Sequence, residues 1–288
     1  MKIGIAFSRT QQVKAHSRWG DNSFEKIKSH GFSAIDYNLA SDTNLIYTAS
    51  QAEIDEFLKK EKLLIEKAGL EISQTHGPWR WPPRDDTAEA REDWLIRMKK
   101  AARATASLGC KYLVIHAVMP FGIHEKGTPE SEQTWQINLV FMRDLLKTAK
   151  ECGVTICLEN MPMPKFTIGS PEEVLRFVQE IDDENFQICL DTGHVSVYDD
   201  LSLKEEVKRL GDYIKVLHVH DNDFGRDAHM YPTFGIINWE EFADALKEIN
   251  YNGVFSLETC PPAKLSDDVF EELSTCLANI AKEITKSL

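Results

Sequence analysis

The sequence has no long apolar segment, no closely paired cysteines and no signal peptide. None of its apolar runs approaches the ~20 residues that a helix needs to span a bilayer. The six cysteines are scattered without a CxxC pair, and Cys157 and Cys189 lie inside apolar runs, where a thiol usually packs as a small hydrophobe. The N-terminal MKIGIAFS has too short an apolar run and no cleavage site. We therefore expect a protein of the reducing cytoplasm with no membrane partner.

Positive charge is also scarce. The chain carries 46 Asp and Glu against 33 Lys and Arg, a formal net charge of −13. DNA-binding proteins obtain much of their affinity from neutralising phosphates, so an acidic protein needs a strong local basic patch to bind DNA. We find none, and the basic residues that can be placed near the expected site are few: Arg80, Arg84, Lys165 and Arg226. We expect a small-molecule substrate and no nucleic-acid partner.

No glycine-rich GxGxxG follows a strand-like run, which disfavours a dinucleotide-binding fold. Instead, short apolar, β-branched runs alternate with helix-period segments along all 288 residues. Eight such runs predict eight parallel strands, and a barrel of roughly 250 residues plus long loops suits this length. The prediction is an α/β fold, a (β/α)8 TIM barrel forming one domain over residues 1–288. The expected strands are Ile3–Phe7, Ala34–Tyr37, Leu70–Thr75, Tyr112–His116, Val154–Glu159, Phe186–Asp191, Tyr213–His220 and Val254–Glu258.

Helix start signals support this alternation. Ser50 with Glu53 and Ser170 with Glu173 have the spacing of capping boxes, the second with Pro171 at the first helical position. Further segments carry apolar residues at helical spacing. They are Thr87–Leu108, Ser131–Cys152, Trp239–Ile249 and Ser266–Ser287.

Histidines and acids concentrate where the predicted strands end, or in the loops that follow. Catalytic groups of TIM barrels lie at this C-terminal end. Six of the nine histidines fall there, whereas His16, His30 and His124 do not and are interpreted as surface or loop residues. The clustered residues are His76, His116, Glu159, Asp191, His194, His218, His220, Asp227, His229 and Glu258.

Imidazole nitrogens and carboxylate oxygens together bind Mn²⁺, Zn²⁺, Fe²⁺ and Co²⁺, and Mg²⁺ prefers oxygen alone. Glu159 and Glu258 terminate apolar runs, where an unpaired carboxylate is costly, so a metal partner is favoured for both. Asp191 could instead cap a helix or pair with a cation. His218 shares a strand face with His220, and for it both a ligand role and a supporting role stay open. The loop Gly77–Pro83, with Trp79, is either a rigid rim or a wall for a sugar ring.

These residues resemble the xylose isomerase-like TIM-barrel superfamily, which contains sugar-phosphate isomerases and epimerases, ketose 3-epimerases, inosose dehydratase-like proteins and endonuclease IV-type apurinic endonucleases. The resemblance runs from MKIGIAF to FSLET. Its most specific stretch is LHVHDNDFGRDAHMYPTFGIINW, and LEN at 158–160 and LDTGH at 190–194 match further family motifs. One departure is Pro232-Thr233-Phe234-Gly235, where the family has P-G-x-G.

The ketose-epimerase pattern implies four metal ligands, of which the two glutamates also act as the acid/base pair. They are Glu159, Asp191, His220 and Glu258. The same pattern implies that His194 and Arg226 bind substrate, and we add His76, His116 and Trp79 as substrate contacts. Asp227 and His229 are candidates for an additional metal. In the endonuclease pattern His76, His116, His194, Asp227 and His229 are ligands as well, and every one of its nine positions is filled.

The resemblance implies a metal-dependent isomerase or epimerase of a sugar or sugar derivative, working by proton transfer through an enediolate. We expect one divalent ion, Mn²⁺ first, with Mg²⁺, Co²⁺, Fe²⁺ and Zn²⁺ as alternatives. A dehydratase or lyase acting on a keto-sugar or inosose, and an apurinic endonuclease, remain open. Assembly into a homo-oligomer is also left open.

Overall fold

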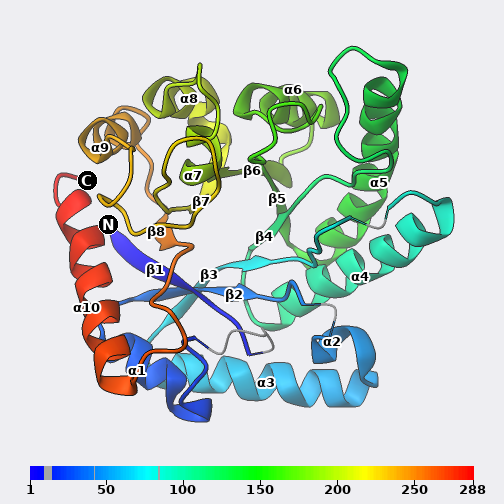
Figure 1. The fold of residues 1–288 in the computed structure, drawn as a ribbon. Coiled ribbons are helices and arrows are strands. Elements are labelled where there is room, and N and C mark those ends of the chain that lie inside the picture. Colours follow the sequence, from blue (N-terminus) through cyan, green and yellow to red (C-terminus); the bar gives the residue numbers. More distant parts are fainter. Residues whose placement is uncertain (10–14, 42, 84) are drawn as a thin grey trace.

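Eight parallel strands close into a barrel with helices packed around it (Figure 1). The computed structural model describes residues 1–9, 15–41, 43–83 and 85–288. Neighbouring strands follow the order β7-β6-β5-β4-β3-β2-β1-β8, and backbone hydrogen bonds from Val219 to Ser256 (2.8 Å) and from Glu258 to Val219 (3.0 Å) join the two ends. The predicted TIM barrel is therefore confirmed. The strands are β1 Lys2–Phe7, β2 Ala34–Asn38, β3 Glu71–His76, β4 Tyr112–Ile115, β5 Thr155–Glu159, β6 Phe186–Asp191, β7 Ile214–His218 and β8 Val254–Leu257.

The helices begin where the sequence places their caps. In α3 and α6 the serines Ser50 and Ser170 form full capping boxes with Glu53 and Glu173. Helix α5 starts at Pro129, two residues before the predicted start, because Thr128 supplies its N-cap. The α-helices are α1 Ser23–Ser29, α2 Leu45–Thr48, α3 Gln51–Lys67, α4 Ala88–Ser107, α5 Pro129–Cys152, α6 Pro171–Ile181, α7 Thr192–Ser196, α8 Leu203–Leu210, α9 Trp239–Glu248 and α10 Asp267–Ile284, with 3₁₀ turns η1 Gly20–Asn22 and η2 Gly211–Tyr213.

Side chains alternate between the two faces of each strand. The main core lies outside the barrel, between strands and helices; there the Phe7 ring of β1 contacts Phe24 of α1 at a centroid distance of 4.6 Å. A smaller apolar cluster fills part of the interior and includes the thiols of Cys157 and Cys189, which are buried and unpaired as expected. No helix among the described residues is long and apolar enough to cross a membrane.

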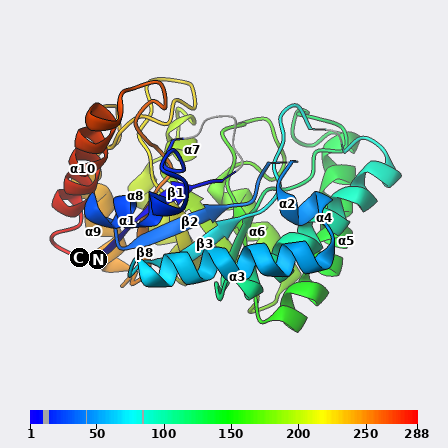
Figure 2. The same ribbon diagram turned by 90° about the horizontal axis from the view of Figure 1, so that it is seen from below.

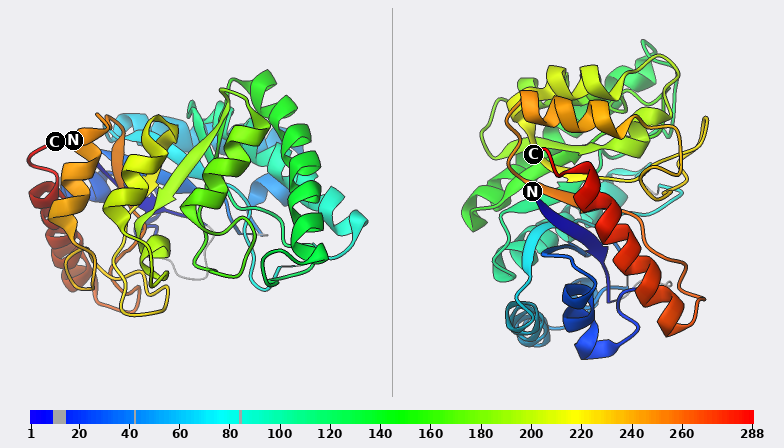
Figure 3. Two further views of the ribbon diagram at one scale, coloured as in Figure 1. Left: turned by 90° about the horizontal axis from the view of Figure 1, so that it is seen from above. Right: turned by 90° about the vertical axis from the view of Figure 1, so that its left-hand side faces the viewer.

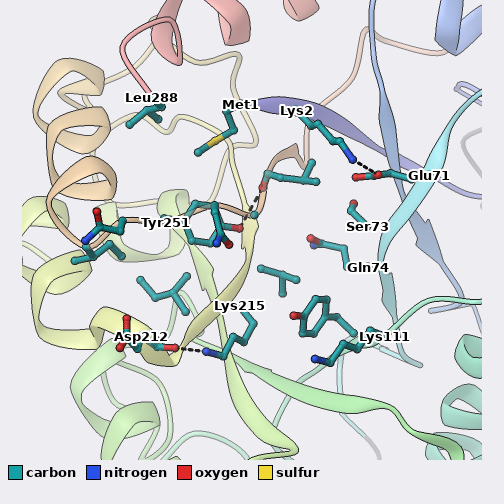
Figure 4. A pocket seen from close by; sticks show the side chains of 18 of the residues that line it. Met1, Lys2, Glu71, Ser73, Gln74, Lys111, Asp212, Lys215, Tyr251 and Leu288 are labelled. Atoms are coloured by element: carbon teal, nitrogen blue, oxygen red, sulfur yellow. Dashed lines mark hydrogen bonds and ion pairs between the residues drawn. The ribbon is translucent and has the colours of Figure 1, made fainter.

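The two ends of the barrel differ in chemistry. Both chain termini lie together at the N-terminal end, on the side away from the long loops that follow the strands (Figure 2 and Figure 3). A cavity of about 910 Å³ opens at this end, and Lys2, Glu71, Lys111 and Lys215 are among its lining residues (Figure 4). It does not contain the predicted acids and histidines, which lie at the opposite end, as barrel enzymes require.

The capping boxes give a test of local stability. Replacing Ser170 with Ala removes the oxygen that accepts from the Glu173 backbone N–H, so Ser170→Ala should lower the free energy of unfolding by about 1 kcal/mol. Urea denaturation followed by circular dichroism measures this. Ser202 begins α8 without a side-chain cap bond, and Ser202→Ala should change stability by less than about 0.5 kcal/mol. Equal losses in both variants would contradict the capping argument.

Candidate metal centre and active site

A cavity of about 400 Å³ lies at the C-terminal mouth of the barrel. The ends of β3, β5 and β6 carry His76, Glu159 and Asp191, while His116 and Glu258 follow β4 and β8 by one residue. Parallel strands end at the same face, so residues far apart in sequence meet there. The predicted residues among the lining are His76, Trp79, His116, Glu159, His194, Asp227, His229 and Glu258.

Asp191 and His220 are fully buried next to this cavity. The Nε2 atom of His220 lies 3.1 Å from Asp191 Oδ1 and 3.6 Å from Asp227 Oδ1. The His220 ring also stacks on His229 at a centroid distance of 4.1 Å. The structure thus joins Asp191 and His220 to the residues that line the mouth.

Four histidines share one orientation. Each places Nδ1 against a backbone carbonyl: His76 at Gly77 (2.8 Å), His194 at Asn160 (2.7 Å), His220 at Asp221 (3.3 Å) and His229 at Glu258 (2.8 Å). A carbonyl oxygen only accepts hydrogen bonds, so Nδ1 carries a proton and, in the neutral ring, Nε2 keeps its lone pair. Metal-binding histidines are held in this tautomer.

The potential ligand atoms form adjoining groups. Within each group, one atom from every residue lies within 4.8 Å of the others. Asp227 adds a carboxylate whose Oδ2 is 3.4 Å from Nε2 of both His194 and His229. Three of these groups are His76 with His116 and Glu159, Asp191 with His194 and His220, and His220 with His229 and Glu258; His218 belongs to two others, with His76 and Glu258 and with Glu159 and Cys189. The four expected ligands are therefore spread over the first three groups, which also contain His76, His116, His194 and His229.

The residues fit a divalent cation. Asp191 Oδ2 is buried and has no hydrogen-bond partner among the described residues, although buried polar atoms are normally satisfied. A Cβ atom at Gly193 would lie only 1.9 Å from Cε1 of His220, so glycine is needed for the ring to occupy its position. Carboxylates mixed with imidazoles suit Mn²⁺, Fe²⁺, Co²⁺ or Zn²⁺.

The electrostatic field at the mouth favours positive charge. Burial alone would lower the pKa of His194, but Asp191 and Asp227 raise it to about 10. Burial likewise opposes charge on His229, yet its hydrogen bond to Asp227 and the nearby Glu258 raise its pKa to about 9. A bound cation would take the place of these protons, because metal ligands bind in the deprotonated form.

The two glutamates experience different environments. Burial favours the neutral form of Glu159, but His218 and His116 outweigh it and hold the pKa of Glu159 well below its usual value. Burial raises the pKa of Glu258, and the nearby charge of Glu159 adds to the increase. Two carboxyl groups with pKa values shifted in opposite directions form a common acid/base arrangement.

The rim of the cavity is aromatic. The Trp79 indole packs edge-on against His116 at a centroid distance of 4.3 Å and lies 6.4 Å from the more exposed Trp81. Trp79 thus packs on the rim and also lines the cavity, and its contact with a sugar ring stays a prediction.

Of the four cationic side chains expected near the mouth, the three that the structure describes form ion pairs. Arg226 is not among the residues that line the cavity: its guanidinium is exposed and binds Asp223, with Nε 2.9 Å from the carboxylate. Arg80 pairs with Asp85 at 3.5 Å, and Lys165 pairs with Glu125. Arg84 lies outside the described residues.

The loop that departs from the family's P-G-x-G motif keeps the backbone path of a glycine turn. Thr233 adopts a left-handed φ of 78°, which is unusual for a β-branched residue. Asp221 holds it there, because its Oδ2 accepts from the Thr233 backbone N–H at 3.0 Å and from the Trp239 indole at 2.8 Å. The next residue, Phe234, points its ring toward solvent and is 64% exposed.

His16 and His30 were predicted to be surface or loop residues; both lie in turns but are buried, and one buried acid was missed. The His16 ring packs edge-on against Phe270, and burial lowers its pKa to about 3. Asp36 is buried inside the barrel, where its Oδ2 lies 2.8 Å from Nε2 of His218. The signal for Asp36 was present, since it interrupts an apolar strand as Glu159 does.

Parts of the chain are similar in sequence to known proteins. Over 132 residues the chain is 30% identical to D-psicose 3-epimerase of Ruminiclostridium cellulolyticum, covering 46% of this chain and 43% of that protein. Over 159 residues it is 27% identical to the probable endonuclease 4 of Mycoplasmopsis agalactiae, covering 51% and 54%. The chain spans about half the length of the curated relatives it matches.

Solved structures match over the whole barrel. A D-tagatose 3-epimerase-like protein superposes with a TM-score of 0.74 at 25% identity, covering 100% of this chain and 99% of the other. The zinc-bound IolI protein superposes with a TM-score of 0.75, covering 100% and 99%, but at 18% identity this likeness shows the fold alone. The sequence profile of the xylose isomerase-like TIM barrel matches residues 24–276. The chain therefore belongs to the xylose isomerase-like TIM barrel family.

Proposed function

We propose that the protein is a divalent-metal-dependent isomerase or epimerase of a sugar or sugar derivative. The observation that carries this proposal is the placement of Glu159 and Glu258, which line one cavity among the Nε2 atoms of the mouth histidines. Relatives of the chain include D-psicose 3-epimerases, which supports the carbohydrate class.

Asp191, His220, Glu159 and Glu258 would hold the cation. When bound, a divalent ion polarises a carbonyl group and stabilises the negative charge that develops on its oxygen. Glu159 is the group better suited to accept a carbon-bound proton, because its surroundings favour the ionised form. Glu258 would return a proton on the opposite face, giving an epimer, or to the neighbouring carbon, giving an isomer.

Other residues of the mouth would select and orient the substrate. The Nε2 atom of His194 is directed into the ligand cluster, where it can contact a substrate oxygen. Trp79 offers an apolar face against which a sugar ring can stack, while His76 and His116 border the same cavity. Loss of a β-hydroxyl or larger group after the same proton removal would instead give a dehydratase or lyase.

Endonuclease-type hydrolysis is the second candidate, because all nine residues of that ligand pattern meet at the mouth. Charge argues against it. Arg80, Lys165 and Arg226 each pair with an acid, and the whole chain carries −13, which leaves little cationic surface for a phosphate backbone.

Metal content is expected to be about one equivalent of divalent ion per chain, with Mn²⁺ first, since the cluster otherwise crowds buried acids. Dialysis against a chelator should lower the melting temperature, and Mn²⁺ at 100 times its Kd should restore about 2.7 kcal/mol of stability. Elemental analysis and thermal unfolding measure both effects. Asp191→Ala should lose the response, whereas His124→Ala should retain it. A full complement of about three ions would favour the hydrolase instead.

Solvent exchange tests the reaction class. Incubated in deuterated water with ketoses, inososes and 3-keto-glycosides, the metal-loaded protein should incorporate deuterium at a carbon of at least one substrate, as mass spectrometry would show. Glu159→Gln and Glu258→Gln should each lower the rate by ~10²–10⁴-fold, because each removes one acid/base group. His124→Ala is the matched control. Unchanged exchange in both Gln variants would exclude the two-carboxylate mechanism.

Binding to DNA tests the alternative, endonuclease-type function. The protein should not bind duplex DNA containing an abasic site at physiological salt, as measured by fluorescence anisotropy, because the described cations expected near its mouth, Arg80, Lys165 and Arg226, are paired with acids. Catalytic cleavage of that DNA, with no exchange in any sugar, would reverse the assignment.

A further inference from the structure

His218 occupies a position unlike that of the four ligand-type histidines. Its Nδ1 atom lies 2.8 Å from Oε1 of Glu159 and 3.4 Å from Oε2 of Glu258. Its Nε2 atom lies 2.8 Å from Oδ2 of Asp36. Both ring nitrogens therefore face carboxylates, whereas each of those four histidines places Nδ1 against a backbone carbonyl. The Nδ1 side of the ring therefore faces both proposed acid/base groups, and Asp36 holds the ring from its Nε2 side.

Asp36 is itself held in place. In the register between β2 and β3, Asp36 pairs with Gln74, so the two side chains emerge side by side inside the barrel. The Gln74 amide nitrogen lies 3.2 Å from Asp36 Oδ2 and 3.1 Å from the Leu217 carbonyl, and donates to both. Gln74 also forms part of the wall of the cavity at the N-terminal end (Figure 4). Hydrogen bonds thus connect β3, β2, β7 and β5 across the barrel interior.

This arrangement is costly for folding. Asp36 is 2% exposed and His218 0%, and Oδ1 of Asp36 has no hydrogen-bond partner in the described part of the chain. Replacing a buried ionic pair with well-packed apolar residues is often neutral or stabilising. The interior already uses that solution nearby, where Val114, Cys157, Cys189 and Val216 form an apolar cluster. Stability therefore does not explain the acid.

The orientation of Glu159 explains why Asp36 lies inside the barrel. With Oε1 of Glu159 bound to His218, the other oxygen is directed at the mouth, 2.8 Å from Nε2 of His116 and 3.5 Å from Nε2 of His76. A ring free to rotate would release Oε1, and the carboxylate could then turn.

We propose that Asp36 is a positioning residue: through His218 it fixes the orientation of Glu159 and keeps the ring in contact with Glu258. The consequence for catalysis rests on the proposed function of the two glutamates, whereas the fixed orientation of the ring does not. Asp36, unlike Glu159, is not among the residues that line the mouth cavity, so it acts through His218.

The test compares three variants of the metal-loaded, full-length protein. Asp36→Leu removes the acceptor at similar size, and Asp36→Asn keeps an acceptor oxygen without the charge. Tyr37→Phe is the matched control: Tyr37 is the next residue on β2, points to the opposite face, and donates to Glu61 at 2.6 Å, so it also loses one buried bond to a carboxylate.

In deuterium exchange, Asp36→Leu should lower kcat on the order of 10²-fold while KM stays within about twofold. Asp36→Asn should recover to within about tenfold of the original kcat, and Tyr37→Phe should leave kcat unchanged even where it lowers the melting temperature. A wild-type kcat in Asp36→Leu would overturn the proposal.

A second measurement needs no turnover. In protein labelled with ¹⁵N-histidine, the ring protons of His218 should appear as slowly exchanging resonances, assigned by their loss in His218→Gln. The Nε2 proton should move upfield in Asp36→Asn, because a neutral amide accepts more weakly than a carboxylate, and stay in place in Tyr37→Phe. This result decides the proposal if Asp36→Leu does not fold or no sugar exchanges. Identical His218 resonances in Asp36→Asn and the original protein would overturn it.

Discussion

The burial of carboxylates inside the barrel mouth is the constraint on which the rest of the site depends. Asp36, Glu159 and Asp191 are each at most 2% exposed, and an isolated charge at such a depth would be very costly. Every one of them lies against an imidazole at 2.8–3.1 Å. The histidines are therefore as much a condition for folding the acids into the barrel as they are potential ligands.

Two kinds of histidine meet this constraint in different ways. His194 and His220 bind backbone carbonyls through Nδ1 and turn Nε2 toward the acids, an orientation that lets a cation replace the proton. His218 binds acids through both nitrogens, and neither of them is turned to a backbone carbonyl. His194 and His220 thus have the orientation of metal ligands, whereas His218 orients the groups around them.

Backbone features place these side chains as much as packing does. Gly193 leaves room for the His220 ring, and the Asp221 carboxylate holds Thr233 in a left-handed turn beside the mouth. The aromatic rim borders a cavity of about 400 Å³. The barrel thus carries a mouth whose walls come from strand ends and from the loops that follow them.

The sequence by itself determined the barrel and most of the mouth, because both follow from local patterns. Strand and helix periodicity predicted eight parallel strands, and residues at strand ends, such as Glu159 and Asp191, necessarily converge in that fold. Tertiary structure decided what local patterns do not contain. The His16 ring is buried against the distant Phe270, and the Arg226 guanidinium pairs with Asp223 at the surface. The role of His218 depends on Asp36, 182 positions away, since only the closed barrel brings the two side chains together.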